Sequence, residues 1–292
     1  MIIANLIGGL GNQMFQYAVG RAISLEQGTA LRLDVSGYEK YKLHHGFELQ
    51  RIFNCPAEVA SEMDMHSVLG WQSAATARKL LSRQGVAWLR SKAFVIEPHF
   101  QYWQGITSVS NDCYLMGYWQ SEKYFSIAED QIRTDFSFKS PLQNKNAEIA
   151  QKILQGNAVS LHVRRGDYAT NPQTTAIHGL CTLDYYRQSI HYVAERVQQP
   201  NFFIFSDDIA WTRDNLNISH QCQYVDFNQG EESYNDMRLM SMCNHHIIAN
   251  SSFSWWGAWL NPKHDKIVVA PKNWFADQTD ARDLLPQSWI KL

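Results

Sequence analysis

The sequence predicts an α/β fold with two domains, each built around a parallel β-sheet. The length of 292 residues exceeds that of one ordinary domain, which is ~150 residues. Strand and helix patterns alternate near both ends of the chain, as they do in βαβ units. With 45% hydrophobic and 18% charged residues, both halves can bury a core. We expect an N-terminal domain over residues 1–150 and a C-terminal domain over residues 151–292.

The N-terminal domain begins with a predicted βαβ unit. Residues 2–7 form a short apolar run, and residues 12–25 place apolar side chains near helical spacing. Residues 30–35 then alternate between apolar and polar side chains, as a strand does. Farther along, residues 74–89 have helical character, and residues 113–119 fit a strand that leads into a loop.

A glycine-rich loop, GGLGNQ at residues 8–13, joins the first strand to the first helix. It is not a P-loop because the Lys-Ser/Thr pair is missing, and Met14 stands where a dinucleotide fingerprint needs its third glycine. Gly9 and Gly11 nevertheless permit a ligand to approach the backbone closely. Asn12 lies at the predicted helix N-terminus, where anions are favoured. The loop is therefore a candidate ligand site.

The second half of the chain predicts another parallel α/β domain. Its buried-strand runs are each followed by polar residues, and helical stretches lie between them. The predicted strands are residues 158–163, 201–205, 246–249 and 266–270, and the predicted helices include residues 184–196 and 231–242. Because ligands of parallel sheets sit beyond the carboxyl ends of the strands, the polar residues there form the main candidate site.

The first polar cluster runs from His162 to Tyr168, at the end of a predicted strand. An arginine next to a tight glycine turn can direct its planar guanidinium toward a pyrophosphate. His162 and Arg164 lie two residues apart, so both project from the same face of an extended strand. Asp167 is a further candidate donor contact in this cluster. The alternative is structural, with Arg164 or Arg165 forming an ion pair with Asp167.

The second cluster is the pair Asp207 and Asp208, which also follows a strand. A carboxylate there could accept hydrogen bonds from guanine or from ribose hydroxyls. Asp208 could instead cap the following helix. We expect no metal site, because the sequence has no Asp-x-Asp triplet and no His or Glu accompanies the pair.

The third cluster is Ser251, Ser252 and Phe253, at the start of a predicted aromatic-rich helix. Serine hydroxyls and free backbone N–H groups at a helix start can bind phosphate oxygens, and Phe253 could stack against a base. Three tryptophans follow within residues 255–259, and core packing is the favoured interpretation for them.

Net charge and cysteine usage exclude several classes of protein. The net charge is −2 and no long Lys/Arg run occurs, so we expect no nucleic-acid partner and no electrostatic attraction to an anionic membrane. The five cysteines are scattered without CxxC spacing, which argues against a disulfide framework and a zinc site. No basic leader or membrane span is recognisable. We expect a cytoplasmic protein with reduced thiols.

Taken together, the motifs resemble those of the bacterial α-1,2-fucosyltransferases of glycosyltransferase family 11. The motifs are GGLGNQMFQYA at 8–18, HVRRGDY at 162–168, FSDD at 205–208 and HHIIANSSFSWWGAWL at 245–260. The likeness also covers residues 117–122, 178–181 and 183–186, and residues 55–95 carry the least of it. The resemblance implies a GT-B architecture: two facing Rossmann-like domains with a cleft between them and the donor in the C-terminal one.

The resemblance also implies an activity and roles for individual residues. The enzyme would transfer L-fucose from GDP-β-L-fucose to the 2-hydroxyl of a terminal β-galactose, with inversion and without a metal or other cofactor. The family's essential arginine falls on Arg164, and His162 beside it would also contact the donor phosphates. Asp207 and residues 252–253 fall where related enzymes hold the nucleotide. Asn12 matches an asparagine that reaches the reaction centre in more distant fucosyltransferases.

The acceptor side is less defined by the sequence. The general base stays open, with Asp34, His44, His45 and Glu48 as candidates, and the leaving phosphate could take the proton instead. The candidate acceptor contacts are His45, Phe47, Glu48 and His178. Lactose, N-acetyllactosamine and a surface-glycan repeat would all fit. An enzyme acting on lipid-linked glycans could associate loosely with the inner membrane, although no basic amphipathic helix is recognisable.

Two alternatives remain at this point. One keeps the fold but changes the linkage, for example to α-1,6, or the transferred sugar. The other is a catalytically silent protein that binds a nucleotide sugar, which could dispense with Arg164 and Asn12. Both residues are present in this chain.

Overall fold

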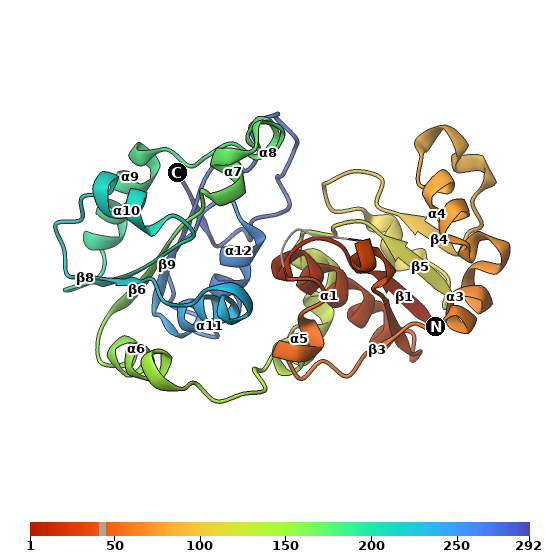
Figure 1. The fold of residues 1–292 in the computed structure, drawn as a ribbon, viewed down its shortest axis with the longest axis horizontal. Helices are drawn as coiled ribbons and strands as arrows, with labels where there is room; N and C mark the ends of the chain where they lie inside the picture. Colours follow the sequence, from red (N-terminus) through yellow and green to blue (C-terminus); the bar gives the residue numbers. More distant parts are fainter. Residues whose placement is uncertain (41–44) are drawn as a thin grey trace. The chain divides into compact units, whose positions relative to one another are not determined.

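Two parallel sheets organise the chain, one in each of two units (Figure 1). The computed structural model describes residues 1–40 and 45–292. The N-terminal unit comprises residues 1–139 and 282–284, and the C-terminal unit comprises residues 140–281 and 285–292. The division thus precedes helix α6 (Asn144–Leu154), part of which the sequence placed in the N-terminal domain. Asn146 of α6 donates to Asn228 Oδ1 (2.8 Å), which fixes this helix to the C-terminal unit.

The N-terminal sheet has five parallel strands in the order β3-β2-β1-β5-β4. The strands are β1 (Ile2–Asn5), β2 (Leu31–Asp34), β3 (Glu58–Val59), β4 (Phe94–Ile96) and β5 (Cys113–Met116). The helices are α1 (Leu10–Glu26), α2 (Leu49–Ile52), α3 (Glu62–Leu69), α4 (Ala75–Leu81) and α5 (Glu129–Asp135). The predicted βαβ opening is confirmed by β1, α1 and β2.

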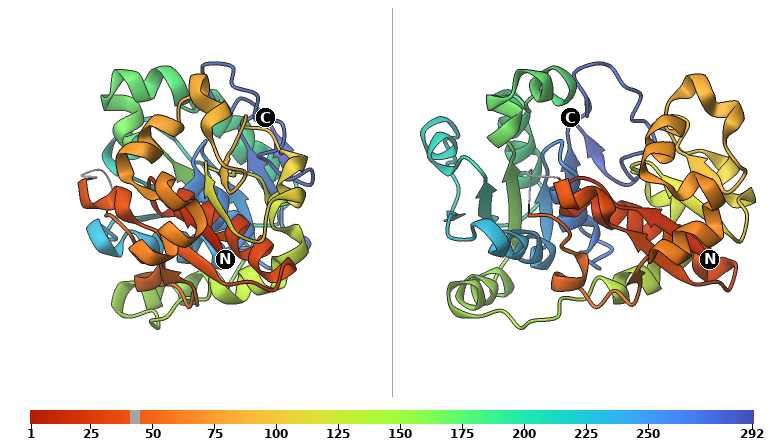
Figure 2. Two further views of the ribbon diagram at one scale, coloured as in Figure 1. Left: turned by 90° about the vertical axis from the view of Figure 1, so that its right-hand side faces the viewer. Right: turned by 45° about the vertical axis from the view of Figure 1, so that its right-hand side comes forward.

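Helix α1 packs against one set of strand residues, and helices α3 and α4 pack against another. A Cβ on Gly20 of α1 would lie 2.8 Å from Leu31 Cδ1 and 3.1 Å from Ala4 Cβ, so the helix backbone packs closely onto β1 and β2. Ile3 and Tyr114 instead share a buried cluster with residues of α3 and α4. Because successive side chains of a strand point to opposite faces, α1 covers one face of the sheet and α3–α4 the other (Figure 2).

The helical character expected for residues 74–89 is confirmed, but it is divided between two helices. Helix α4 ends at Leu81, Arg83 is extended (φ −78°, ψ 138°), and a 3-10 helix, η3 (Gln84–Leu89), follows. The break is stabilised by Arg90, whose guanidinium donates to the carbonyls of Leu81 (2.6 Å) and Arg83 (2.9 Å). The Leu81 carbonyl is one of those that a helix end leaves without an intrahelical partner.

The C-terminal sheet has six parallel strands in the order β11-β10-β9-β6-β7-β8. The strands are β6 (Ala158–Val163), β7 (Asn201–Ser206), β8 (Cys222–Val225), β9 (His245–Ile247), β10 (Val268–Ala270) and β11 (Ile290–Lys291). The further helices are α7 (Gly166–Thr170), α8 (Pro172–His178), α9 (Leu183–Ala194), α10 (Ile209–Asn215), α11 (Tyr234–Met242) and α12 (Ser252–Trp259). Helices α9 and α10 cover one face of the sheet, and α6, α11 and α12 cover the other (Figure 1).

Aromatic side chains fill the core beside α12. Trp255 and Trp256 are 0% exposed and Trp259 is 4% exposed, which confirms core packing for this cluster. All five cysteines are free thiols. Within residues 1–40 and 45–292, no helix is both long and apolar enough to cross a bilayer.

Candidate functional site

Three of the four sequence motifs meet at the carboxyl edge of the C-terminal sheet. Strand β6 pairs with β7 so that Val163 lies opposite Ser206, and it pairs with β9 on its other side. The residues that follow these three central strands therefore emerge side by side. The fourth motif, the glycine loop, follows β1 in the N-terminal unit.

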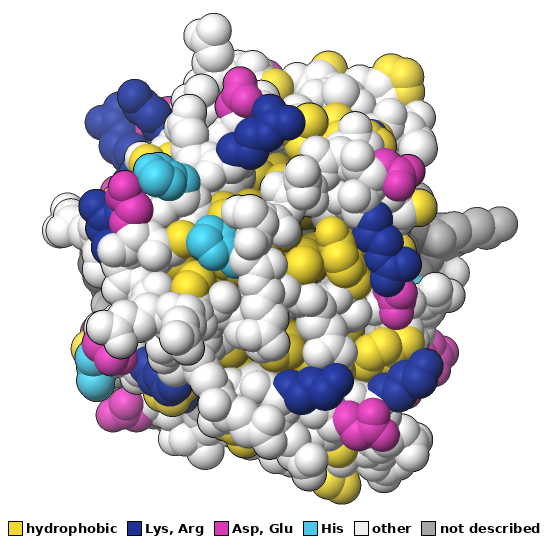
Figure 3. All heavy atoms as spheres, turned by 90° about the vertical axis from the view of Figure 1, so that its left-hand side faces the viewer, with side chains coloured by type: hydrophobic (Ala, Val, Ile, Leu, Met, Phe, Trp, Pro, Cys, Tyr) yellow, Lys and Arg dark blue, Asp and Glu magenta, His cyan; other side chains and the backbone are white. Residues whose placement is uncertain are grey.

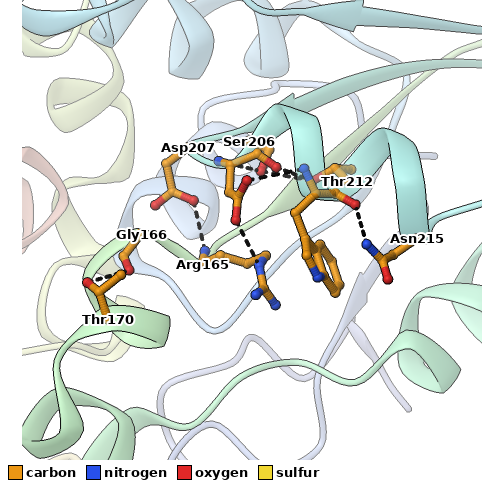
Figure 4. Close-up of polar contacts among 9 residues, drawn as sticks. Arg165, Gly166, Thr170, Ser206, Asp207, Thr212 and Asn215 are labelled. Atoms are coloured by element: carbon orange, nitrogen blue, oxygen red, sulfur yellow. Dashed lines mark hydrogen bonds and ion pairs between the residues drawn. The ribbon is translucent and has the colours of Figure 1, made fainter.

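Two arginines and two aspartates connect the ends of β6 and β7. Arg164 Nη1 lies 2.8 Å from Asp207 Oδ2, and the backbone N–H of Arg165 donates to Asp207 Oδ1 (2.8 Å; Figure 4). Arg165 Nε donates to Asp208 Oδ2 at 3.2 Å. The arginines thus have Asp207 and Asp208 as partners; the side chain of Asp167, the partner considered from the sequence, lies outside the described residues.

Gly166 is required for this arrangement. A Cβ on Gly166 would lie 2.5 Å from Asp207 Oδ2, the oxygen that holds Arg164. Any side chain at this position would push the carboxylate away from the guanidinium. The glycine of the motif therefore serves a close approach between the two strand ends.

The two arginines differ in how extensively their side chains pack against the rest of the C-terminal unit. The Arg165 guanidinium lies 3.6 Å above the Trp211 ring, and its partner Asp208 caps α10 by accepting the Trp211 N–H (3.2 Å). The helix-capping interpretation of Asp208 is thus confirmed. The Arg164 side chain is 25% exposed beside Asp207, with its guanidinium 5.3 Å from the Tyr168 ring. Nucleotide contacts by Asp207 and Asp208 stay a prediction.

His162 is buried next to Arg164, with 6% of its surface exposed. Burial, followed by the charge of Arg164, lowers the pKa of His162 to about 3, so the imidazole is neutral. Its Nδ1 has no hydrogen-bond partner in the part of the chain that the structure describes. Because buried polar atoms normally have partners, this nitrogen is a candidate ligand contact. The Phe253 ring lies 5.9 Å from the imidazole.

The segment between β9 and α12 is held by Asn250, which the sequence analysis did not select. Asn250 Nδ2 donates to the His178 carbonyl (2.7 Å) and to the Trp274 carbonyl (3.3 Å). Ser251 is the N-cap residue of α12 and makes no side-chain capping bond, and Ser252 follows as the first helical residue. Asn250 could have been selected from the sequence, because it lies in the motif at 245–260, directly before the two serines.

His178, expected at the acceptor side, belongs to the C-terminal unit. Its ring stacks on Tyr168 with centroids 4.7 Å apart and an interplanar angle of 13°. The Tyr168 hydroxyl donates to the Asn250 carbonyl at 3.5 Å. Tyr168 therefore connects His178, Arg164 and the start of α12.

At the carboxyl edge of the N-terminal sheet, Asn12 lies between the turn after β5 and its own glycine loop. Its Oδ1 accepts a hydrogen bond from Gln120 Nε2 (2.7 Å). Gly8 has φ +81°, and a Cβ there would lie 2.6 Å from Asn12 Nδ2. The glycines before α1 therefore allow Asn12 to pack against the backbone of its own loop.

The stretch expected to contact the acceptor is attached to the glycine loop through Gln13. Gln13 Nε2 donates to the Gly46 carbonyl (2.8 Å), and its Oε1 accepts the Glu48 N–H (3.0 Å). Glu48 is 3% exposed and pairs with Arg51 at 2.8 Å. His45 is exposed and Phe47 is partly exposed, whereas His44 lies outside the described residues.

Asp34, another candidate base, is buried among hydrogen-bond donors. It is 4% exposed and accepts from the Tyr114 hydroxyl (2.7 Å) and from Arg78 Nη1 (2.6 Å). Burial opposes its charge, but hydrogen bonds and the charge of Arg78 outweigh burial and hold the pKa of Asp34 below its ordinary value. Asp34 is therefore a structural anion and a poor base.

A carboxylate that the sequence analysis missed, Glu97, directly follows β4. It is partly exposed and accepts the N–H groups of Tyr118 (2.7 Å) and Trp119 (3.0 Å). Burial raises the pKa of Glu97 to about 7, despite the opposing effect of these two bonds. Trp119 has φ +55°, a strained conformation of the kind that occurs at functional sites. No motif marks Glu97, so only the fold identifies it.

Glu97 and Asn12 are connected through one turn, residues 117–120. This turn gives Glu97 two N–H donors and gives Asn12 the Gln120 amide, and its Gly117 carbonyl accepts from Gln16 of α1 (3.0 Å). A carboxyl with a raised pKa and a polar amide thus share one edge of the sheet. Across residues 1–40 and 45–292, no three His, Cys, Asp or Glu side chains are placed to hold a metal ion.

Comparison with known proteins assigns the chain to a protein family. The model of Glycosyl transferase family 11 matches residues 67–292. An α-1,2-colitosyltransferase of Escherichia coli is 39% identical over 100% of this chain and 99% of that protein. Galactoside 2-alpha-L-fucosyltransferase SEC1 of Bos taurus is 31% identical over 50% of this chain and 41% of that protein.

Among solved structures, the fucosyltransferase NodZ from Bradyrhizobium superimposes with a TM-score of 0.56. It is 14% identical and the match covers 89% of this chain and 92% of that one. At this identity the likeness concerns the fold alone. Together with two parallel-sheet units, it confirms the GT-B class that the motifs implied.

Proposed function

Because the chain belongs to glycosyl transferase family 11, we propose that it transfers L-fucose from GDP-β-L-fucose to the 2-hydroxyl of a terminal β-galactose, with inversion. Membership in the family confirms the resemblance that the four motifs predicted. The observation that carries the proposal is Arg164, a partly exposed cation that Asp207 holds at 2.8 Å at the carboxyl end of a central strand.

The donor pyrophosphate would bind where the ends of β6 and β9 lie side by side. A guanidinium matches paired phosphate oxygens, and the N-terminus of α12 adds backbone N–H groups. The neutral imidazole of His162 can donate a hydrogen bond to the same anion without changing its charge. As the bond between fucose C1 and the phosphate oxygen breaks, the electron pair leaves with GDP, and Arg164 stabilises the charge that develops there. Metal independence is part of the proposal, because Arg164 supplies the cation.

The proton of the acceptor hydroxyl would go to Glu97. An effective general base has a pKa near the working pH, and burial raises the pKa of Glu97 to about 7. Asp34 and Glu48 are instead engaged with Arg78 and Arg51. The acceptor oxygen bonds to fucose C1 as its proton passes to the carboxylate, and Glu97 later releases the proton to water.

A second candidate differs only in the transferred sugar. The relative that is 39% identical over the whole chain is named an α-1,2-colitosyltransferase. Colitose is fucose without its 3-hydroxyl, so the two donors present the same pyrophosphate and anomeric carbon. The 31% identity to a galactoside 2-alpha-L-fucosyltransferase supports fucose and a galactoside. Comparing both nucleotide sugars as donors therefore belongs in the first experiment.

The test is GDP release in the presence of EDTA, measured with each donor and with lactose or no acceptor. Arg164→Ala should lower turnover by about 10²–10³, the usual loss for one preorganised donor group. Arg213→Ala is the matched control, since it removes an exposed Arg–Asp pair of 2.7 Å in the same unit. NMR of the product should place fucose on galactose O2. Faster turnover with the colitosyl donor would favour the second candidate, and binding without turnover on any galactoside would contradict both.

A further inference from the structure

A basic segment of the N-terminal unit is not used by the proposed reaction. No Asp or Glu occurs between Asp64 and Glu97, a stretch that contains Arg78, Lys79, Arg83, Arg90 and Lys92. This composition stands out in a chain whose net charge is −2. On the face drawn in Figure 3, by contrast, basic and acidic side chains lie interspersed.

Large apolar side chains are exposed in the same segment. Trp88 is 81% exposed, Trp71 is 66% exposed and Leu80 is 49% exposed. All ten tryptophans lie within the described residues, and of these Trp71 and Trp88 alone are exposed. Two exposed tryptophans in one short segment make it a candidate contact surface, since exposed apolar groups that lie together mark interaction sites.

The fold brings these side chains out of one small region. Trp71 lies in the 3-10 helix η2 (Gly70–Ser73), next to the buried Gln72. Gln72 Nε2 donates to the Leu89 carbonyl, and its Oε1 accepts the Ser91 N–H, both at 3.2 Å. These bonds hold η2 against the end of η3, where Trp88 precedes Leu89. The two tryptophans therefore flank one pair of hydrogen-bonded segments.

The cations of the segment divide into inward and outward groups. Arg78 pairs with Asp34, and Arg90 donates to backbone carbonyls. Lys79, Arg83 and Lys92 are exposed and form no ion pair with any residue that the structure describes. Their charges are therefore available to an external partner.

We propose that this tryptophan–basic surface, formed by Trp71, Lys79, Leu80, Arg83, Trp88 and Lys92, binds an anionic lipid bilayer. Tryptophan rings favour the level of the lipid headgroups, and lysine and arginine are attracted to the negative surface potential. A second copy of the same surface would bring cations against cations, so charge complementarity favours the bilayer. No such attraction was expected from the sequence, because other residues separate these cations and no long Lys/Arg run marks them.

The proposal is tested with the full chain and sedimented vesicles. Vesicles containing phosphatidylglycerol should bind the protein, neutral phosphatidylcholine vesicles should not, and added salt should weaken the binding. Near such a surface each cation contributes a factor of about five, so Lys79→Gln with Arg83→Gln should weaken binding about thirtyfold. Trp71→Ser with Trp88→Ser should also weaken it.

A matched control separates this surface from general exposure of apolar groups. Ile127→Ser with Leu154→Ser changes side chains that are 76% and 71% exposed elsewhere, and binding should stay unchanged. None of these variants should alter GDP release with a soluble acceptor, so failure of this inference is distinguishable from failure of the proposed function. No binding to anionic vesicles, equal binding by all variants, or self-association lost in the tryptophan variant without vesicle binding would overturn the proposal.

Discussion

Replacement of Glu97 by Gln gives a direct test of how the acceptor proton is removed. The ordinary pKa of a glutamate is 4.5, and burial raises that of Glu97 to about 7. The carboxylate is the active form, so wild-type kcat/KM for the acceptor should reach its plateau about one pH unit above the pKa. It should fall about tenfold for each pH unit below the pKa, or about a hundredfold at pH 5. An unshifted glutamate would leave activity constant down to about pH 4.5.

An amide cannot take up the proton, so Glu97→Gln should remove the acidic limb centred near pH 7. General-base loss typically lowers the rate by 10²–10⁴. The assay is the initial rate of GDP release from pH 5 to pH 9 at low acceptor concentration. Glu129→Gln is the control, because it alters a glutamate that is 49% exposed in the same unit.

The two carboxylate oxygens of Glu97 each accept one backbone N–H group, and the introduced amide replaces one of them with an NH₂ donor, so thermal stability must be measured alongside the rate. A purely structural role would lower the stability of the variant and leave the pH limb in place. Retention of that limb near pH 7, or a rate within threefold of wild type at pH 8, would refute the general-base assignment.

Three further predictions concern the C-terminal unit. The pKa of His162 is about 3 in the fold and 6.5 ordinarily, so it binds a proton only on unfolding. The neutral imidazole therefore adds to the free energy of unfolding above pH 6.5, and this contribution is lost as pH falls. Between pH 7 and pH 5, urea titrations should show that the free energy of unfolding falls by about 2 kcal/mol more in wild type than in His162→Gln. Asp207→Asn should raise the KM for the donor and reduce kcat/KM about tenfold through misorientation of Arg164, with little change in Tm, because ion pairs this exposed stabilise weakly. Gly166→Ala should fold but show the same kinetic defect, since the new Cβ would lie 2.5 Å from Asp207 Oδ2 and push this oxygen away. An unchanged donor KM in either variant would contradict the orienting role.

The sequence predicted the C-terminal sheet and its edge better than any other part of the chain. Strand β6 was expected at residues 158–163 and spans Ala158–Val163, because a run of buried apolar residues ends in a polar glycine turn. Strand β8 (Cys222–Val225) was missed because three of its four residues are only partly buried, so the segment lacks the continuous apolar signal. Periodicity detects burial, and it fails where an edge strand is half covered.

The partners within the site could not be predicted in the same way. The sequence suggested Asp167 as the partner of the arginines because it is near in the chain. The Asp167 side chain lies outside the described residues, and the partners that the structure shows are Asp207 and Asp208, which become neighbours because β6 pairs with β7. Glu97 was invisible for a related reason, since its raised pKa depends on burial and its partners lie on the turn after β5.

The proposed reaction makes opposite electrostatic demands, and in this proposal Arg164 would meet one of them and Glu97 the other. Departing GDP gains negative charge, which requires a cation such as Arg164. The acceptor hydroxyl must lose a proton, which requires a base whose pKa is high enough, and burial provides this for Glu97. A guanidinium next to Glu97 would lower that pKa and weaken the base. The negative charge of Asp207, whose Oδ2 lies 2.8 Å from Arg164 Nη1, compensates the positive charge of Arg164. The two groups follow strands of different sheets, and the polar partners of each that the structure shows lie within its own unit.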